Sequence, residues 1–94
     1  MAAQLLIKTR RVLSEMAFAE IVVWKVPTPL LGSTHAFKYR LAFVVDGVCV
    51  LRYDNETGKG DHKHVGGKEI PYLFTSPEQL LADFWREIDN WRPL

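Results

Sequence analysis

Residues 37–54, FKYRLAFVVDGVCVLRYD, carry the clearest indication of the fold. Apolar and polar residues alternate before Asp46-Gly47, a pattern that is typical of a β-strand. The Asp-Gly pair is typical of a two-residue type I′ turn, because both residues of that turn need positive φ. We therefore expect an antiparallel hairpin in which Val45 opposes Val48.

A two-residue turn sets the predicted register along the whole hairpin. Residues that oppose one another across two strands share a face of the sheet. Near the turn the predicted pairs are apolar on both faces, and farther out they become polar and charged. The predicted outer pairs are Leu41 with Arg52, Arg40 with Tyr53 and Tyr39 with Asp54.

Further strands are predicted before and after this hairpin. Residues 4–13 mix apolar and basic side chains and would suit a strand or a helix, and we favour a strand because a strand follows. Residues 18–26 (FAEIVVWKV) are rich in β-branched and aromatic side chains, and Pro27 ends this strand. After the hairpin, residues 55–60 (NETGKG) indicate a second turn. Residues 61–65 (DHKHV) then indicate a short strand that ends at paired glycines.

The end of the chain predicts a helix. Ser76 is the expected N-cap, Pro77 the first helical residue and Gln79 the partner in a capping box. Apolar residues then recur at a spacing of three and four, which forms a stripe that packs on one face of the sheet. The predicted stripe is Leu80, Leu81, Phe84, Trp85, Ile88 and Trp91. The sequence thus predicts an α+β fold, an antiparallel, meander-like sheet of four to five strands with a C-terminal helix on one face.

Length and composition indicate one small globular domain, residues 1–94. With 48% hydrophobic and 24% charged residues, the chain has the balance of an ordinary folded protein. No apolar run reaches the ~18–20 residues that cross a bilayer, and the N-terminal basic residues follow the short apolar run, the reverse of a secretory signal. We therefore expect a cytoplasmic protein with no membrane partner. The single cysteine, Cys49, is expected to be a small buried residue.

The net charge of +1 predicts no partner, but the charges are unevenly distributed. Residues 1–40 hold six basic and two acidic side chains, whereas residues 76–94 hold two basic and four acidic ones. A basic sheet face would attract phosphate. The alternative is an ordinary solvated surface of mixed charge.

The polar stretch RYDNETGKGDHKH, residues 52–64, holds the candidate chemistry. Glycines on both sides of Lys59 would let an anion approach the backbone. The spacing lacks the GxxxxGK[ST] pattern and a strand is expected to follow, so a P-loop nucleotide site is excluded. His62 and His64 would point the same way on a strand and could reach one metal ion, with Asp61 facing away and His35 as a possible addition. Two histidines do not complete a zinc site, so we predict neither a metal nor another cofactor.

The same residue types suit metal-independent cleavage of RNA. That reaction needs a base for the 2′-OH proton, an acid for the leaving 5′ oxygen and cations for the charged phosphate. The predicted catalytic residues are His62, His64, Lys59 and Tyr53. The predicted substrate-binding residues are Arg40, Arg52, Lys38, Asp54 and Asp61. In the alternative interpretation this is a polar hairpin end, where Asp54 and Asp61 accept hydrogen bonds from turn N–H groups.

Four strings in the chain resemble the TumE family, small bacterial proteins described as toxins of type II toxin–antitoxin pairs. The strings are VVWKVP, KYRLAFVVDGVCVLRYDN, GKGDHKHVGG and PYLF followed by LLADFW. They lie between residues 22 and 85, and the resemblance extends from about residue 6 to residue 91. The resemblance implies a toxin that inhibits growth by acting on RNA or translation. It also implies a partner antitoxin, which we expect to carry a DNA-binding domain.

Together, the residues and the resemblance favour a toxin that acts on RNA as a metal-independent, endoribonuclease-like protein. One alternative is a non-catalytic module that binds RNA or protein through the polar hairpin end. Another places the functional surface on an exposed sheet edge, where an antitoxin adds a strand.

Overall fold

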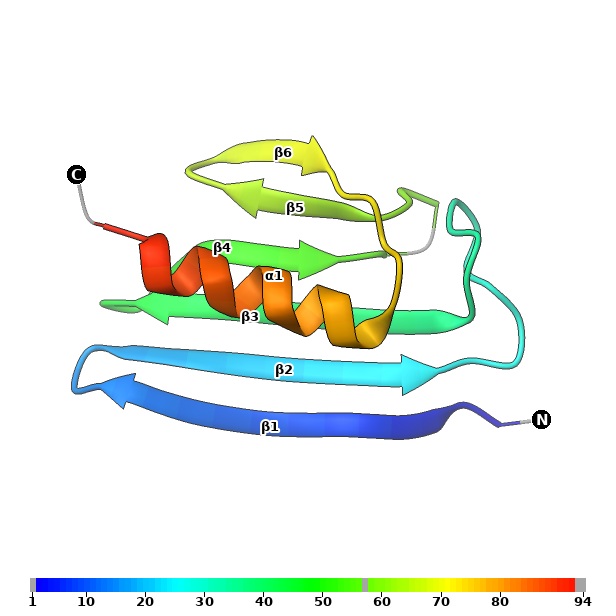
Figure 1. Ribbon diagram of the computed structural model, residues 1–94, viewed down its shortest axis with the longest axis horizontal. Helices are drawn as coiled ribbons and strands as arrows, with labels where there is room; N and C mark the ends of the chain where they lie inside the picture. Colours follow the sequence, from blue (N-terminus) through cyan, green and yellow to red (C-terminus); the bar gives the residue numbers. More distant parts are fainter. Residues whose placement is uncertain (1, 57, 93–94) are drawn as a thin grey trace.

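The computed structural model describes residues 2–56 and 58–92 and has a six-stranded antiparallel sheet with one helix (Figure 1). The strands follow one another in the sheet in chain order, so the sheet is a meander. The predicted α+β fold with a C-terminal helix is confirmed, with more strands than predicted. The elements are β1 (Gln4–Ser14), β2 (Ala17–Lys25), β3 (Phe37–Val45), β4 (Val48–Asp54), β5 (His62–Val65), β6 (Lys68–Pro71) and α1 (Pro77–Asn90).

The additional strand is β6, in a segment that the sequence indicated only as the approach to the helix. Gly66 and Gly67 have φ values of 56° and 81°, close to the 52° and 76° of Asp46 and Gly47. Both pairs therefore have the positive φ values of a two-residue hairpin turn. The paired glycines return the chain along β5 instead of ending the sheet, and Pro71 is tolerated because β6 is an edge strand.

The register predicted for the β3–β4 hairpin is wrong beyond the first two pairs. Phe43 pairs with Leu51, so Val50 is an extra residue that forms a β-bulge. Every later pair is shifted by one residue, and the side chains that follow the bulge exchange faces. The outer pairs are Ala42 with Arg52, Leu41 with Tyr53 and Arg40 with Asp54.

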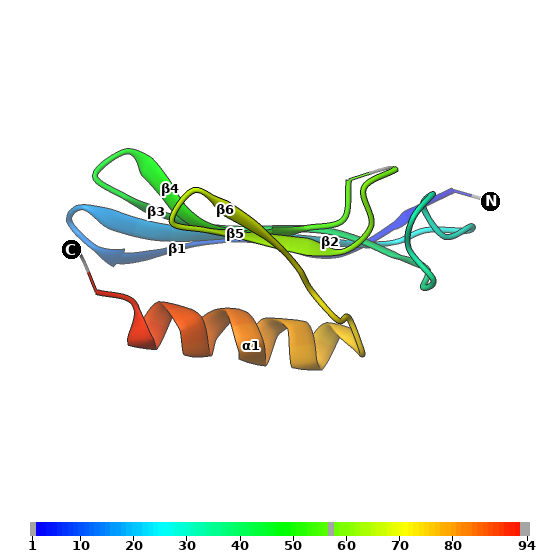
Figure 2. The same cartoon turned by 90° about the horizontal axis from the view of Figure 1, so that it is seen from above.

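Helix α1 lies along one face of the sheet and leaves the other face bare, which we call the uncovered face (Figure 2). Leu80 and Phe84, on the predicted apolar stripe, are fully buried against the sheet. Burial of a large apolar side chain contributes about 1.5–3 kcal/mol, so this single layer of contacts is the main source of stability. The buried core consists of Ala19, Ile21, Val23, Tyr39, Leu41, Phe43, Leu51, Tyr53, Leu80 and Phe84.

The predicted N-cap and first helical residue are confirmed, but among the described residues the Gln79 side chain makes no hydrogen bond back to Ser76 that would complete the predicted capping box. The Ser76 hydroxyl accepts a hydrogen bond from the backbone N–H of Gln79 at 3.0 Å, and Pro77 is the first helical residue. The side-chain amide of Gln79 donates forward to Asp83 at 2.8 Å. In the part of the chain that the structure describes, no helix is long and apolar enough to cross a membrane.

The prediction that Cys49 is buried is wrong. Cys49 is exposed, and it pairs with Val44 next to the hairpin turn. Val44 follows the core residue Phe43, so both Val44 and Cys49 belong to the uncovered face. No element of the described chain covers that side of the sheet, which explains why Cys49 is exposed and Val44 only partly buried.

Candidate functional site

Three neighbouring strands place polar side chains on the uncovered face. Leu41 and Tyr53 point into the core, so the residues beside them in β3 and β4 point away from it. In the ladders, Asp54 lies between Arg40 of β3 and His62 of β5, and Arg52 lies opposite His64. The bulge in β4 is therefore what brings these charged side chains onto one face.

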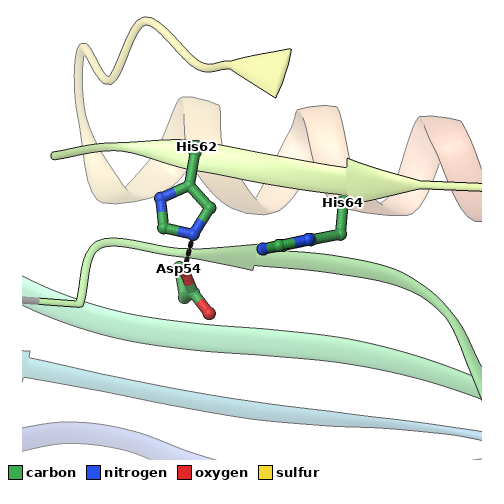
Figure 3. Close-up of side chains that lie close together, drawn as sticks. All are labelled: Asp54, His62 and His64. Carbon is green, nitrogen blue, oxygen red and sulfur yellow. Dashed lines mark ion pairs between the residues drawn. The ribbon is translucent and has the colours of Figure 1, made fainter. Parts of the chain in front are cut away.

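His62 is fixed from both sides of its ring. Its Nδ1 lies 2.9 Å from the carbonyl oxygen of Gly60, and because a carbonyl only accepts, Nδ1 carries a proton. Its Nε2 lies 2.5 Å from Oδ1 of Asp54, the ion pair drawn in Figure 3. His62 and Asp54 are only 4% and 8% exposed, so this pair is shielded from water.

The Gly60 carbonyl is held by close packing between two loops. A Cβ atom on Gly32, which has a φ of 94°, would lie 2.7 Å from the backbone nitrogen of Gly60. The backbone N–H of Gly58 donates to the carbonyl oxygen of Leu31 at 2.7 Å. A Cβ atom on Gly60 would lie 2.9 Å from the carbonyl oxygen of Gly32, so Gly32 and Gly60 are both needed for this approach, which orients the group that fixes His62.

Arg52 connects the Asp54 carboxylate to the second histidine. Its Nε lies 2.9 Å from Oδ2 of Asp54, and its Nη2 lies 2.9 Å from Nε2 of His64. A guanidinium only donates, so Nε2 of His64 is the acceptor and the proton of that ring is on Nδ1. The ring centroids of His62 and His64 are 5.0 Å apart. One imidazole is thus held as a donor and the other as an acceptor.

Two hollows adjoin these side chains. The first, which we call the arginine hollow, has a volume of about 380 Å³, and the second, the histidine hollow, has about 410 Å³. The Asp54–His62 pair borders both, because Asp54 lines one and His62 the other. The arginine hollow is lined by Lys38, Tyr39, Arg40, Arg52, Asp54 and Glu56, and the histidine hollow by Lys59, Asp61, His62, Glu69 and Pro71.

Tyr53, a predicted catalytic residue, lies on the opposite face. Its side chain is fully buried under α1, and its hydroxyl donates to Oε1 of Glu87. Lys63 contacts the same carboxylate oxygen at 2.6 Å. Burial, followed by the hydrogen bond to Glu87, raises the pKa of Tyr53 far above its usual value. The phenol therefore stays protonated and does not share a face with the histidines.

Asp61, a predicted substrate-binding residue, faces away from His62 and His64, as its place in the strand predicted. Its carboxylate accepts from the Ser33 hydroxyl at 2.8 Å and the Tyr39 hydroxyl at 2.6 Å, and it contacts Nε2 of His35 at 2.7 Å. With three partners and only 11% of its side chain exposed, Asp61 ties a loop to the core. His35 is held there too, so it does not join the other two histidines.

The two lysines of the predicted site lie in different hollows. Lys38 is exposed and lines the arginine hollow with Arg40 and Arg52. Lys59 lines the histidine hollow, with 56% of its side chain exposed, and lies 3.9 Å from Glu56. The structure therefore gathers Lys38 with the arginines and leaves Lys59 at the edge of the site.

The uncovered face also presents a set of side chains that could hold a metal ion. Asp54, His62 and His64 each offer one ligand atom, and these atoms lie within 4.8 Å of one another (Figure 3). Oε1 of Glu69 lies 3.7 Å from Nε2 of His62. The sequence prediction considered the two histidines as metal ligands and named Asp54 only as a substrate-binding residue, because the assumed register did not place Asp54 beside His62. Glu69 was missed altogether, because β6 was not expected.

The sequence from residue 3 to residue 92 matches the family described as Toxin TumE. The chain belongs to the TumE toxin family. The match spans every residue of the site described above, and membership in a family of toxins implies an antitoxin partner for this TumE-family chain. No curated protein and no solved structure matches the chain.

Proposed function

We propose that this TumE-family toxin acts on RNA through the uncovered face of its sheet, as a metal-independent endoribonuclease. The observation that carries the proposal is the pair of contacts made by Arg52, one to Asp54 and one to His64, with His62 and His64 only 5.0 Å apart. A base, an acid and a phosphate-binding cation thereby adjoin one another.

The arginine hollow supplies the binding site for the RNA backbone. Lys38, Arg40 and Arg52 line it together, and the side chains of Lys38 and Arg40 are exposed. Guanidinium groups bind phosphate through paired N–H donors, which gives orientation as well as attraction. A phosphate bound by Arg52 also competes with His64 for the same donor, so substrate binding releases the imidazole that acts as base.

The residues then divide the proton transfers. His64 takes the proton of a ribose 2′-OH, and the 2′ oxygen attacks the adjacent phosphorus. The bond from phosphorus to the 5′ oxygen breaks, and His62, which borders the histidine hollow, gives the leaving oxygen a proton. Arg40 and Arg52 stabilise the additional charge on the phosphate oxygens. The products are a 2′,3′-cyclic phosphate and a 5′-hydroxyl, and no metal takes part.

The roles assigned to three of the predicted residues change in this proposal. Tyr53 takes no part in the proton transfers, because it is covered by α1 on the other face. Asp61 acts as a positioning residue for the loop that leads into β5. Lys59, at the edge of the histidine hollow, contributes only long-range electrostatic attraction of RNA.

The second candidate function is recognition without catalysis. His62 and Asp54 are nearly buried and already paired with one another, which is also typical of a structural ion pair beneath a binding surface. In that case the same face binds RNA, or a protein, and leaves it intact. Binding of RNA would then weaken steeply with salt while no cleavage product forms.

The test is an assay of the purified chain on single-stranded RNA in the presence of a chelator. His64→Ala should abolish cleavage and keep binding, and Arg40→Ala should weaken binding. Arg86→Ala is the matched control, because it removes the same charge from α1, where the side chain is 65% exposed. Cleavage by wild type should leave 2′,3′-cyclic phosphate ends. Full activity of His64→Ala would overturn the mechanism, and binding without any cleavage by wild type would support recognition instead.

We further propose that the antitoxin carries a DNA-binding domain and that the toxin acts in the cytoplasm, where RNA is accessible. We expect the antitoxin to bind over the charged uncovered face and so block access of RNA to it. The gene beside this one is the direct test: an encoded helix-turn-helix protein that co-purifies with the toxin supports the proposal. A neighbouring protein that suppresses toxicity without any DNA-binding domain would contradict it.

A further inference from the structure

We propose that this chain binds one divalent transition-metal ion, with Zn²⁺ as the probe, through Asp54, His62 and His64, with Glu69 as the fourth ligand. All four side chains project from β4, β5 and β6 onto the uncovered face. The atoms of the first three lie within 4.8 Å of one another, and Oε1 of Glu69 lies 3.7 Å from Nε2 of His62. The inference concerns binding alone, and it goes beyond the proposed action on RNA.

The surroundings of His62 match those of a metal-bound histidine. Metal-ligating histidines usually donate their other ring N–H to a carbonyl or carboxylate, which fixes the ring and its tautomer. His62 makes that contact from Nδ1 to the Gly60 carbonyl, at 2.9 Å. Its Nε2 then points at Asp54, toward the position that an ion would occupy (Figure 3).

Asp54 offers a buried carboxylate oxygen atom as a ligand. Oδ2 is engaged by Nε of Arg52 at 2.9 Å. Oδ1 is buried, and among the residues that the structure describes its ion-pair contact with Nε2 of His62, at 2.5 Å, does not have the geometry of a hydrogen bond. Burying a charged oxygen is costly unless a well-placed cation satisfies it. A metal ion bound by both Oδ1 and Nε2, after the two atoms move apart, would do so.

The kinds of ligand select the ion. Two imidazoles and two carboxylates provide four nitrogen and oxygen ligands, which suits tetrahedral Zn²⁺ at bond lengths of about 2.0–2.2 Å. Ca²⁺ and Mg²⁺ prefer oxygen ligands, so the two imidazoles disfavour them. Around such an ion the ligand atoms would be roughly 3.3–3.6 Å apart, so Oδ1 of Asp54 and Nε2 of His62, now at 2.5 Å, must separate, while the other ligand atoms must approach. The side chains that must move most are His64, which is partly exposed, and Glu69, which is 49% exposed.

Arg52 disfavours metal binding, because it carries a positive charge and contacts His64, but its side chain has space to move away. The contact of its Nη2 with His64 must break, because one lone pair serves either Arg52 or the metal. The Arg52 side chain is 33% exposed and lines the arginine hollow, which gives the guanidinium space to turn. The same lone pair is the base in the proposed RNA cleavage. Bound metal and proton transfer by His64 therefore exclude one another.

The test measures Zn²⁺ binding by the full chain, without an affinity tag and without RNA. Every protein carries Cys49→Ser, because the exposed thiol is itself a ligand for zinc. Calorimetry of the Cys49→Ser chain should show one ion bound. His64→Ala should weaken the affinity about tenfold or more, and Glu69→Ala should weaken it less. His35→Gln is the matched control, because it removes an imidazole from the other face and should leave the affinity unchanged.

A spectroscopic measurement on the Cys49→Ser chain tests metal binding even if one of the ligand variants unfolds. Co²⁺ in a four-coordinate site absorbs strongly in the visible range, and this band should appear with the Cys49→Ser chain and disappear when Zn²⁺ is added. Circular dichroism checks that each variant is folded. No saturable binding, or an equal loss of affinity in His64→Ala and His35→Gln, would overturn the inference. Because no RNA is present, neither result depends on the proposed function.

Discussion

Nη2 of Arg52 lies 2.9 Å from Nε2 of His64, and the two residues are direct partners in the ladder between β4 and β5. Their separation is therefore set by the backbone of the sheet. The same guanidinium reaches Asp54 through Nε, so one side chain connects the anion beside His62 to the second imidazole. This forked contact distinguishes Arg52 from the other cations that line the arginine hollow.

Arg52→Lys tests whether cleavage needs the two directed contacts of the guanidinium or only its positive charge. A lysine amine is a single point of charge and cannot reproduce two contacts in fixed directions. We expect RNA binding to change little and cleavage under single-turnover conditions to slow by about tenfold or more, the scale of losing one preorganised donor. Arg40→Lys is the control and should have the smaller effect on the rate. An equal loss of cleavage rate in both variants would show that the arginines of the hollow contribute only their positive charge.

Gly32→Ala should destabilise the protein more than Gly58→Ala. Both glycines have positive φ, 94° and 87°, so either change costs about 1–2 kcal/mol in backbone strain. Only at Gly32 would the new Cβ also meet backbone, 2.7 Å from the nitrogen of Gly60, whereas nothing lies within 4 Å at Gly58. The difference between the two variants in urea unfolding measures the clash. Equal losses of stability would mean that the two loops separate at little cost.

The elements with local signals were predictable from the sequence. Asp46-Gly47 set the hairpin turn, Ser76 and Pro77 set the start of the helix, and the spacing of Leu80 and Phe84 identified the buried stripe. Each of these depends on residues close together in the chain, where turn geometry, capping and helical periodicity act directly.

The composition of the site was less predictable, because it depends on one residue with no local signal. Val50 is an ordinary β-branched residue, and nothing in VCVL distinguishes a bulged strand from a regular one. The bulge forms because the shifted register places Leu51 and Tyr53 in the core and Asp54 outside it. A single-residue error in register exchanges the two faces, which is why Tyr53 was grouped with the histidines.

The three tyrosines, Tyr39, Tyr53 and Tyr72, should resist ionisation until the protein unfolds. Burial, and after it a hydrogen bond to a carboxylate, raises the pKa of each phenol above its usual value. Above about pH 10 the unfolded chain loses these protons and the folded chain keeps them, so stability falls as the pH rises past that point. Phenolate absorbance should therefore stay flat and then appear for all three residues together, at the pH where circular dichroism reports unfolding.

Tyr72→Phe provides the comparison for this alkaline transition. It removes one of the three protons retained by the folded chain, so stability should fall less steeply with pH above about pH 10. The hydroxyl also donates to Asp83 at 2.5 Å, so stability at neutral pH should fall as well. Gradual phenolate absorbance around pH 10 in a chain that keeps its native circular dichroism would contradict the structure of these three sites.

Asp83 should stabilise the protein at neutral pH and lose that effect in acid. Burial acts to raise the pKa of this carboxyl, but hydrogen bonds from Tyr72 and Gln79 and the charge of Arg86 outweigh it, so the pKa is lowered. A lowered pKa in the folded state gives stability that is present above the unfolded value, about 4, and is lost as the pH falls below it. Asp83→Asn should therefore cost about 1 kcal/mol at pH 7, and the difference from wild type should narrow near pH 3.

Asp89→Asn is the matched control for this prediction, because it removes the same charge from an exposed position of α1. A change there should stay within about 0.5 kcal/mol at either pH. Urea unfolding of the three proteins at pH 7 and pH 3 makes the comparison. If Asp83→Asn remained equally destabilising at both pH values, the effect would come from lost packing between α1 and Tyr72 and not from the carboxylate charge. If Asp89→Asn matched it at pH 7, the general charge of the helix would be the cause.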